Sequence, residues 1–238
     1  MKLKIISWNV NSVRKRKEQI EDLINNEDPD IVMLQETKVD DSLFPDFNSI
    51  FSAYHGQKAR NGVAILSKKP SVIISKSPLE ARLIAIKYTN CVFINVYVPN
   101  GFSVSASMEM KMALSNKLKE FIKKLGKVPI VIGGDVNIAY EAKYFTCENP
   151  FDQIEIDCFK ELESLFVDPS DNRQYITWWD YRANSFNRNI GMGIDRFFLS
   201  NHWSYKPTQV LKKYRNNDNP SDHAPIMIEI NLKNIITI

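Results

Sequence analysis

Short apolar runs alternate with helix-like stretches along the whole chain. Apolar runs bounded by Gly, Pro and Asn are typical of buried strands, whereas apolar residues spaced three and four apart are typical of helices. Helices are predicted from residue 13 to about 26, over 107–125 and over 152–166. The predicted strands are residues 2–8, 30–34, 49–53, 62–67, 72–75, 83–88, 92–98, 128–132, 175–179, 193–199, 207–212 and 224–230.

These elements are expected to form two sheets. The strands fall into two batches, each accompanied by helices, which favours two sheets packed face to face with helices on their outer faces. No repeat, linker or low-complexity stretch divides the chain. Residues 1–238 are therefore interpreted as a single domain of the α/β (α+β) class.

Polar side chains, most of them acids or amides, recur where the predicted strands end or begin. Each one alone has a plain structural explanation, because Asn and Asp often form turns and caps. Their repetition favours a functional site, since strand ends can meet on one rim of a sheet, where loops carry functional groups. The residues are Asn9, Glu36, Tyr97, Asn100, Asp135, Asn137, Asp195, Asp222 and His223.

The residue types in this set indicate metal-assisted hydrolysis. Carboxylates without neighbouring cysteines are hard oxygen ligands, which suit Mg²⁺ or Mn²⁺. His223 can change charge near neutral pH, and its sequence neighbour Asp222 suggests a catalytic pair. The chain has no nucleophile-elbow, P-loop or Rossmann glycine pattern. Attack of water on a phosphodiester is the reaction consistent with these groups.

Longer motifs occur in a fixed order from about residue 5 to residue 230. They are Trp8-Asn9-Val10-Asn11, Leu34-Gln35-Glu36-Thr37-Lys38, Asn95-Val96-Tyr97-Val98-Pro99-Asn100-Gly101, Gly134-Asp135-Val136-Asn137, Trp178-Trp179-Asp180-Tyr181-Arg182, Gly193-Ile194-Asp195 and Ser221-Asp222-His223-Ala224-Pro225. In this order they resemble the exonuclease III branch of the endonuclease/exonuclease/phosphatase superfamily, the class II abasic-site endonucleases. The resemblance extends over nearly the whole chain.

The resemblance implies a fold and a cofactor. The fold would be deoxyribonuclease I-like, a four-layered sandwich in which two packed mixed β-sheets are flanked by helices. The cofactor would be Mg²⁺ (or Mn²⁺). The implied metal-binding set is Glu36 as the principal ligand, surrounded by Asn9, Asn11, Asp135, Asn137 and Asp222.

The resemblance also implies roles in catalysis. Asp195, and not Asp222, would hydrogen-bond His223 and fix its orientation and charge. Asp135 would position or deprotonate the attacking water. The residues that would contact the scissile phosphate are Asn137, Tyr97 and His223.

The implied substrate is double-stranded DNA with abasic sites or blocked 3′ ends. The activities would be base-excision-repair cleavage on the 5′ side of the lesion and trimming of 3′ ends, with a 3′→5′ exodeoxyribonuclease activity left open. A pocket for a sugar without its base would be lined by Trp178, Met192 and Ile194. The alternative is that the three are ordinary core residues, which for Ile194 is nearly as plausible. Contacts to DNA phosphates, which position a duplex without reading sequence, are assigned to Lys38, Lys58, Arg60, Arg82, Asn100 and Asn189.

Two stretches depart from the family pattern. Residues 101–110 contain no basic residue, and Lys111 follows them alone. The segment 138–177 looks shorter than in the family and is acidic, with Glu155 and Glu163 among its carboxylates. Family members use these regions to hold DNA. Duplex affinity and the balance between exonuclease and endonuclease activity therefore stay open.

Composition changes this picture little. The net charge of +3 and the pI near 8.6 permit a polyanionic partner without requiring one. The 3 cysteines form no CxxC pair, which favours a reducing, cytoplasmic setting. No signal peptide or long apolar span is recognised, so no membrane partner is expected. The resemblance favours a monomer.

Two alternative functions stay open from the sequence. The first is a superfamily phosphodiesterase that acts on phospholipid or inositol phosphate, against which the Glu36 and Trp178 motifs speak. The second is a DNA-binding protein with an inactive site, which is disfavoured because the expected catalytic positions carry the expected residue types.

Overall fold

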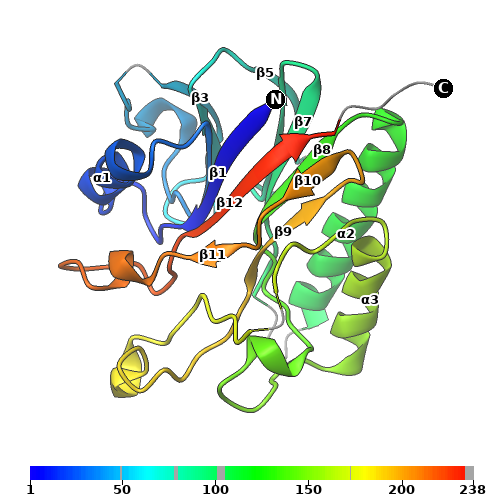
Figure 1. Ribbon diagram of the computed structural model, residues 1–238. Coiled ribbons are helices and arrows are strands. Elements are labelled where there is room, and N and C mark those ends of the chain that lie inside the picture. The colour runs from blue at the N-terminus through cyan, green and yellow to red at the C-terminus, as the bar shows by residue number, and fades with distance from the viewer. Residues whose placement is uncertain (49, 78–79, 101–104, 172, 234–238) are drawn as a thin grey trace.

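Two β-sheets pack face to face in the protein, with helices on both outer faces (Figure 1). Helix α1 (Lys17–Glu27) packs on the first sheet, and helices α2 (Ser105–Leu125) and α3 (Gln153–Glu163) pack on the second. This four-layered sandwich confirms the predicted fold class. The computed structural model describes residues 1–48, 50–77, 80–100, 105–171 and 173–233.

The first sheet brings the two ends of the chain together. Its strand order is β10-β12-β1-β2-β4-β3, with β11 paired to β12. Strand β1 runs parallel to β2 and antiparallel to β12, so β12 lies inside the sheet and not at its edge. The strands are β1 (Lys2–Asn9), β2 (Ile31–Gln35), β3 (Phe51–His55), β4 (Val63–Ser67), β10 (Trp203–Tyr205), β11 (Gln209–Val210) and β12 (Ile226–Leu232).

The second sheet has the order β5-β6-β7-β8-β9. Strands β7 and β8 are parallel, and the other neighbours are antiparallel. The strands are β5 (Val72–Lys76), β6 (Leu83–Tyr88), β7 (Cys91–Tyr97), β8 (Ile130–Asp135) and β9 (Asp195–Leu199). Single 3₁₀ turns occur at Asp41–Leu43, Ala142–Tyr144, Arg182–Asn184 and Lys212–Arg215.

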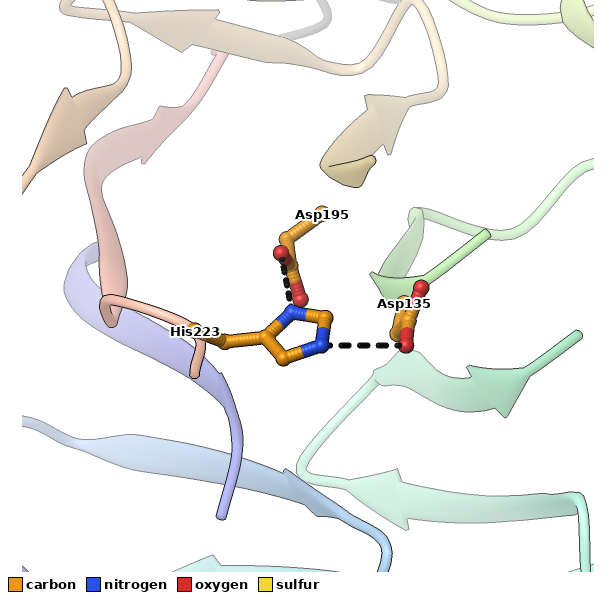
Figure 2. A group of neighbouring side chains, drawn as sticks. All are labelled: Asp135, Asp195 and His223. Atoms are coloured by element: carbon orange, nitrogen blue, oxygen red, sulfur yellow. Dashed lines mark hydrogen bonds and ion pairs between the residues drawn. The ribbon is translucent and has the colours of Figure 1, made fainter. Parts of the chain in front are cut away.

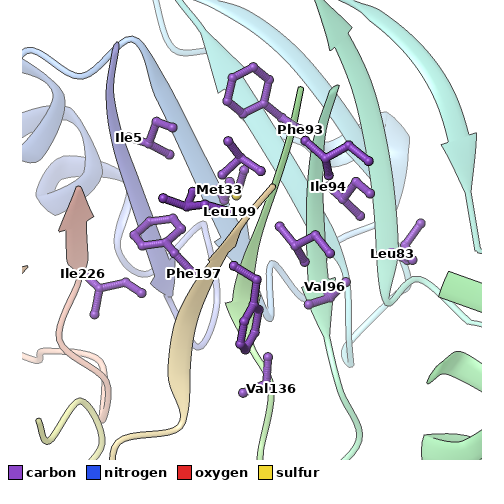
Figure 3. Packing of buried hydrophobic residues seen from close by; sticks show 14 of the residues in the cluster. Ile5, Met33, Leu83, Phe93, Ile94, Val96, Val136, Phe197, Leu199 and Ile226 are labelled. Atoms are coloured by element: carbon purple, nitrogen blue, oxygen red, sulfur yellow. The ribbon is translucent and has the colours of Figure 1, made fainter. Parts of the chain in front are cut away.

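Successive side chains of a strand point to opposite faces of its sheet, so the apolar side chains of one strand are divided between the cluster inside the sandwich and the cluster under the outer helix. On β1, Ile5 belongs to the cluster between the sheets, whereas Trp8 packs in the cluster under α1. Figure 3 shows Ile5 and Met33 of the first sheet near Phe93 and Phe197 of the second. None of the helices in the described ranges is long and apolar enough to cross a bilayer.

Some predicted strands differ from those observed. Residues 175–179 form isolated bridges, because Trp178 N donates to Met192 O whereas Trp179 N donates to Asp222 O, so no regular ladder develops. The predicted strand 207–212 shortens to β11, and β10 was not predicted. Residue 49 of the predicted strand 49–53 lies outside the described residues.

Gly134, on the strand that carries Asp135, is expected to tolerate no side chain. Its φ is +147°, and a Cβ atom there would lie 1.9 Å from the carbonyl oxygen of Val96 on β7. Gly134→Ala should therefore lower the free energy of unfolding by about 3 kcal/mol or more, measured by urea denaturation. The control is Gly126→Ala, where φ is +68° and no atom lies within 4 Å. Similar losses in both variants would contradict the steric explanation.

Candidate active site

The polar residues at the strand ends lie together on one rim of the sandwich. The pairing of β7 with β8 sets Tyr97 beside Asp135, and the pairing of β8 with β9 sets Asp135 beside Asp195. The opposite sheet supplies Asn9 at the end of β1, Glu36 directly after β2, and His223 shortly before β12. The site is thus built half from each sheet.

His223 lies between two carboxylates (Figure 2). Its Nδ1 atom is 2.8 Å from Asp195 Oδ2, and its Nε2 atom is 3.8 Å from Asp135 Oδ2. The imidazole is buried, with 4% of its surface exposed. Asp222, its sequence neighbour, turns away and accepts hydrogen bonds from Trp178 Nε1 and Asn11 Nδ2, both at 3.1 Å. The two residues of the turn therefore have different surroundings.

Thr177 fixes the position of Asp195 and was not predicted from the sequence. Its hydroxyl donates to Asp195 Oδ2 at 2.6 Å and accepts from the backbone N–H groups of Ile194 and Asp195, both at 3.1 Å. Thr177 is fully buried. The only sequence signal was its place directly before the Trp178 motif, and a threonine in an apolar stretch is an ordinary strand residue.

The carboxylates around His223 change its protonation. Burial alone lowers the pKa of His223, but the negative charges of Asp195, Asp135 and Asp222 outweigh burial and raise the pKa to about 10. Burial raises the pKa of Asp135 to about 8, against the opposing charge of His223. A protonated imidazole therefore faces a carboxyl group that binds a proton more readily than usual, which suits proton transfer near neutral pH.

These pKa values predict that stability falls in alkaline solution. A histidine pKa raised from 6.5 to about 10 means that folding holds the proton more tightly. The resulting stability is fully present below pH 6.5 and is lost as the pH rises toward about 10. Urea denaturation in EDTA over this pH range should show the decline, and His223→Asn should flatten it. His202→Asn, outside this cluster, is the control and should leave the slope unchanged.

Glu36 is the centre of a second group of polar contacts. Its Oε1 atom accepts hydrogen bonds from Asn9 Nδ2 at 3.0 Å and from the Tyr97 hydroxyl at 2.9 Å. Its Oε2 atom lies 2.7 Å from Lys38 Nζ, which also donates to Asn11 Oδ1 at 2.5 Å. Burial raises the pKa of Glu36, but the hydrogen bonds from Asn9 and Lys38 outweigh burial and lower it. The group therefore stays ionised.

Two parts of the rim could hold a divalent cation. Asp135, Asp195 and His223 offer ligand atoms within 4.8 Å of one another. Asp195 and His223 are already hydrogen-bonded to each other, however, which leaves fewer free lone pairs. The second part is formed by Glu36, Asn11 and Asp222: Glu36 Oε2 and Asn11 Oδ1 both accept hydrogen bonds from Lys38 Nζ, which a cation would have to displace, and Asp222 accepts one from Asn11 Nδ2. Because these are hard oxygen donors, the residues fit Mg²⁺ or Mn²⁺.

Asn137 and Tyr97 lie at the edge of the same rim. Asn137 has a left-handed backbone (φ 46°), its N–H donates to Asp135 Oδ1 at 3.0 Å, and its Nδ2 donates to Val98 O at 2.9 Å. Burial and the charges of Glu36 and Asp135 raise the pKa of Tyr97. Its hydroxyl therefore remains a hydrogen-bond donor.

The predicted pocket residues are unequally exposed. Met192 and Ile194 are buried within the main apolar cluster, whereas Trp178 is half-buried. The Trp178 indole lies beside the rim because its Nε1 donates to Asp222. Trp178 is thus the member of this set that has exposed surface next to the site.

The predicted DNA contacts lie in several environments. Lys58, Arg60 and Asn100 are exposed on loops. Arg82 lies 4.7 Å from the Tyr97 ring centre and pairs with Glu80 at 2.6 Å. Lys38 is part of the Glu36 group, and the half-buried Asn189 accepts a hydrogen bond from Trp179 Nε1 at 3.4 Å.

Lys111, which follows the non-basic stretch 101–110, forms an ion pair with Glu155 of the acidic segment 138–177. Their Nζ and Oε1 atoms are 2.6 Å apart, and the side chains are only 7% and 5% exposed. Lys111 Nζ also donates to the backbone oxygen of Asn137 at 3.3 Å. The basic residue that follows the non-basic stretch is therefore a buried support for the Asn137 turn and offers no charge to a bound duplex.

Comparison with known proteins identifies the family to which this chain belongs. A model of the Endonuclease/Exonuclease/phosphatase family matches residues 6–223. The chain belongs to that family. It is 30% identical over 256 residues to an exodeoxyribonuclease of Bacillus subtilis (strain 168), which covers 97% of this chain and 100% of the relative.

Solved structures place this family member on the deoxyribonuclease I-like fold. The 3′ phosphatase NExo from Neisseria, bound to a product DNA hairpin, superposes with a TM-score of 0.90 at 29% identity, covering 96% of this chain and 99% of that one. An AP endonuclease from Archaeoglobus fulgidus gives a TM-score of 0.86 at 29% identity, with coverages of 95% and 98%. The predicted family is confirmed, and the protein is a hydrolase of the exonuclease III/AP endonuclease type.

Proposed function

We propose that this protein is a Mg²⁺-dependent DNA-repair phosphodiesterase that cuts 5′ to abasic sites and trims blocked 3′ ends. The observation that carries the proposal is the position of His223 between Asp195 and Asp135, on the same rim as Glu36. We further propose that residues 1–238 act as one catalytic domain, as an intracellular monomer. Manganese would serve in place of magnesium, because the donor oxygens suit both ions.

The residues divide the work of hydrolysis. Glu36, with Asn11 and Asp222, would hold a divalent cation, whose positive charge would be available next to the scissile phosphate. In its ionised form Asp135 accepts the proton of the attacking water, whose oxygen bonds to phosphorus as the P–O3′ bond breaks. The O3′ oxygen leaves as a hydroxyl group after it takes a proton from solvent. His223, kept protonated and oriented by Asp195, stabilises negative charge on the phosphate oxygens.

Neutral donors complete the surroundings of the phosphate. The hydroxyl of Tyr97 and the amide of Asn137 lie at the rim, where they would hydrogen-bond to phosphate oxygens. Asn9 contributes indirectly, because its Nδ2 bridges Glu36 Oε1 and Asp135 Oδ2 at 3.0 and 2.9 Å and so sets their separation.

The substrate proposal rests on Trp178 and on the distribution of charge. The exposed part of the Trp178 indole beside Asp222 would receive a sugar that lacks its base. Since the buried Lys111–Glu155 pair offers no charge to a long duplex, we favour abasic cleavage and 3′-end trimming over processive duplex degradation. The solved relative that is a 3′ phosphatase with a product DNA hairpin supports end trimming.

One comparison of substrates tests the proposal. Cleavage of an abasic duplex, an intact blunt duplex and a 3′-phosphate end is measured with matched Mg²⁺ and protein. We expect rapid processing of the first and third substrates and slower degradation of the blunt duplex. Turnover of sphingomyelin or inositol phosphates without DNA cleavage would overturn the proposal, as would binding of abasic DNA without cleavage in either Mg²⁺ or Mn²⁺.

A further inference from the structure

The contacts that assemble the site cross from one sheet to the other. The two halves of the site are therefore correctly placed only if the sheets keep a fixed position relative to each other along their strands. This relative position is called the offset of the sheets. The crossing contacts are Tyr97 to Glu36 (2.9 Å), Asn9 to Asp135 (2.9 Å) and His223 to Asp195 (2.8 Å).

A polar group lies between the sheets directly behind the site, in a region otherwise filled by apolar side chains. Ser7, Gln35 and Asn95 are each 0% exposed. Gln35 Nε2 donates to Ser7 Oγ at 3.0 Å and to Asn95 Oδ1 at 2.7 Å. Asn95 Nδ2 donates to the backbone oxygens of Leu34 and Ala64, both at 2.8 Å. Asn95 belongs to the second sheet and the other four residues to the first, so these bonds join the sheets.

The position of this group along the strands connects it to the site. Ser7 precedes Asn9 by two residues on β1, and Asn95 precedes Tyr97 by two residues on β7. Residues two apart on a strand point to the same face and are separated by about 6.6 Å. A shift of the sheets at Ser7 and Asn95 would therefore be transmitted directly to Asn9 and Tyr97.

The sheets also approach each other closely at this level. A Cβ atom at Gly133, two residues before Asp135, would lie 2.7 Å from Met33 Sδ of the first sheet. The missing side chain at Gly133 thus leaves room for Met33, and van der Waals contact alone fixes the distance between the two sheets at this level. Apolar contact is not directional, so it sets the separation of the sheets more firmly than their offset.

We propose that Ser7, Gln35 and Asn95 form a register lock that positions the two halves of the active site. In the observed offset Gln35 Nε2, Ser7 Oγ, Asn95 Oδ1 and Asn95 Nδ2 have hydrogen-bond partners, whereas Gln35 Oε1 has none. Another offset would leave more of these buried polar atoms without partners. The three are positioning residues, since they act through Tyr97, Asn9 and their partners and touch no substrate. The activity test of this lock rests on the proposed function, whereas its spectroscopic test does not.

The test replaces the lock by apolar side chains of similar size, in the triple variant S7A/Q35M/N95L. We expect a folded protein in which kcat on the abasic duplex falls at least about tenfold while KM changes little, because small misplacements of catalytic groups mainly affect the chemical step. The Nδ1 proton resonance of His223, recorded without substrate, should shift or broaden as its bond to Asp195 is disturbed.

Phe93→Leu is the matched control, because Phe93 is buried between the sheets on the same strand and makes apolar contacts. It should lower stability but leave kcat and the His223 resonance unchanged. If the triple variant keeps both kcat and the resonance, or if Phe93→Leu changes them as much, the register lock is wrong.

A second variant covers the case in which the triple variant does not fold. S7A/Q35M removes the bond from Gln35 to Asn95 but keeps the two bonds from Asn95 to the backbone of the first sheet. We expect a smaller fall in kcat and a smaller shift of the His223 resonance, and an unchanged resonance overturns the lock. If the wild-type protein cleaves no DNA, the proposed function fails, and the resonance still tests the lock.

Discussion

Replacing His223 with asparagine is expected to lower the rate of abasic-DNA cleavage at least about a hundredfold. The substitution removes a group whose pKa is raised to about 10 and which, in the proposed mechanism, places positive charge beside the phosphate at neutral pH. Asparagine keeps hydrogen-bonding capacity but has no charge. The measurement is single-turnover cleavage of an abasic duplex at saturating protein, so that the chemical step and not binding is compared.

Asp195→Ala should have an effect of similar size, because Asp195 orients and charges His223 at a distance of 2.8 Å. The double variant should then be little worse than either single variant, since the two residues act as a unit. His202→Asn is the control for the loss of a histidine elsewhere. Normal cleavage by the His223 or Asp195 variant would exclude the assigned roles, provided that circular dichroism shows a native fold.

Removal of divalent cations should abolish cleavage, and added Mg²⁺ or Mn²⁺ should restore it. Glu36→Gln is expected to raise the concentration of Mg²⁺ needed for half-maximal activity by about tenfold or more, because the proposed metal position would lose one of its few carboxylates. The measurement is a Mg²⁺ titration of the cleavage rate at constant ionic strength, together with direct Mn²⁺ binding by electron paramagnetic resonance.

Glu229→Gln is the matched control for this prediction. Glu229 pairs with Lys2 and Lys206 on the first sheet and lies away from the rim. It should leave the Mg²⁺ requirement unchanged. Cleavage that persists in excess EDTA, or an unchanged Mg²⁺ requirement in Glu36→Gln, contradicts the proposed metal position.

Most of the fold was predictable because its strands are strongly apolar and bounded by turn residues. The runs that became β1, β2, β4, β6 and β8 are buried and continuous, so periodicity and length were sufficient. Residues 175–179 have the same apolar appearance, yet they cross the rim between Met192 and His223 and make bridges to both. Local sequence does not report which partners a segment will meet.

The site was predictable as a set of residue types at strand ends, but not its supports. Thr177 and Gln35 carry no charge, and their places beside the Trp178 motif and within the Glu36 motif do not show that they support other side chains. Lys111 and Glu155 were visible only as departures from a family pattern. Their pairing became clear when α2 and α3 were seen to bring them within 2.6 Å.

The place of β12 inside the first sheet has a consequence for the synthesis of the protein. His223 lies shortly before this strand, and β12 separates β1 from β10. A nascent chain can pair β1 with β2 early, but the other long side of β1 remains open until Ile226–Leu232 of β12 have left the ribosome. The nuclease centre therefore cannot assemble before β12 has been made. A chain truncated before residue 223 should bear an exposed strand edge and have no ability to cut DNA.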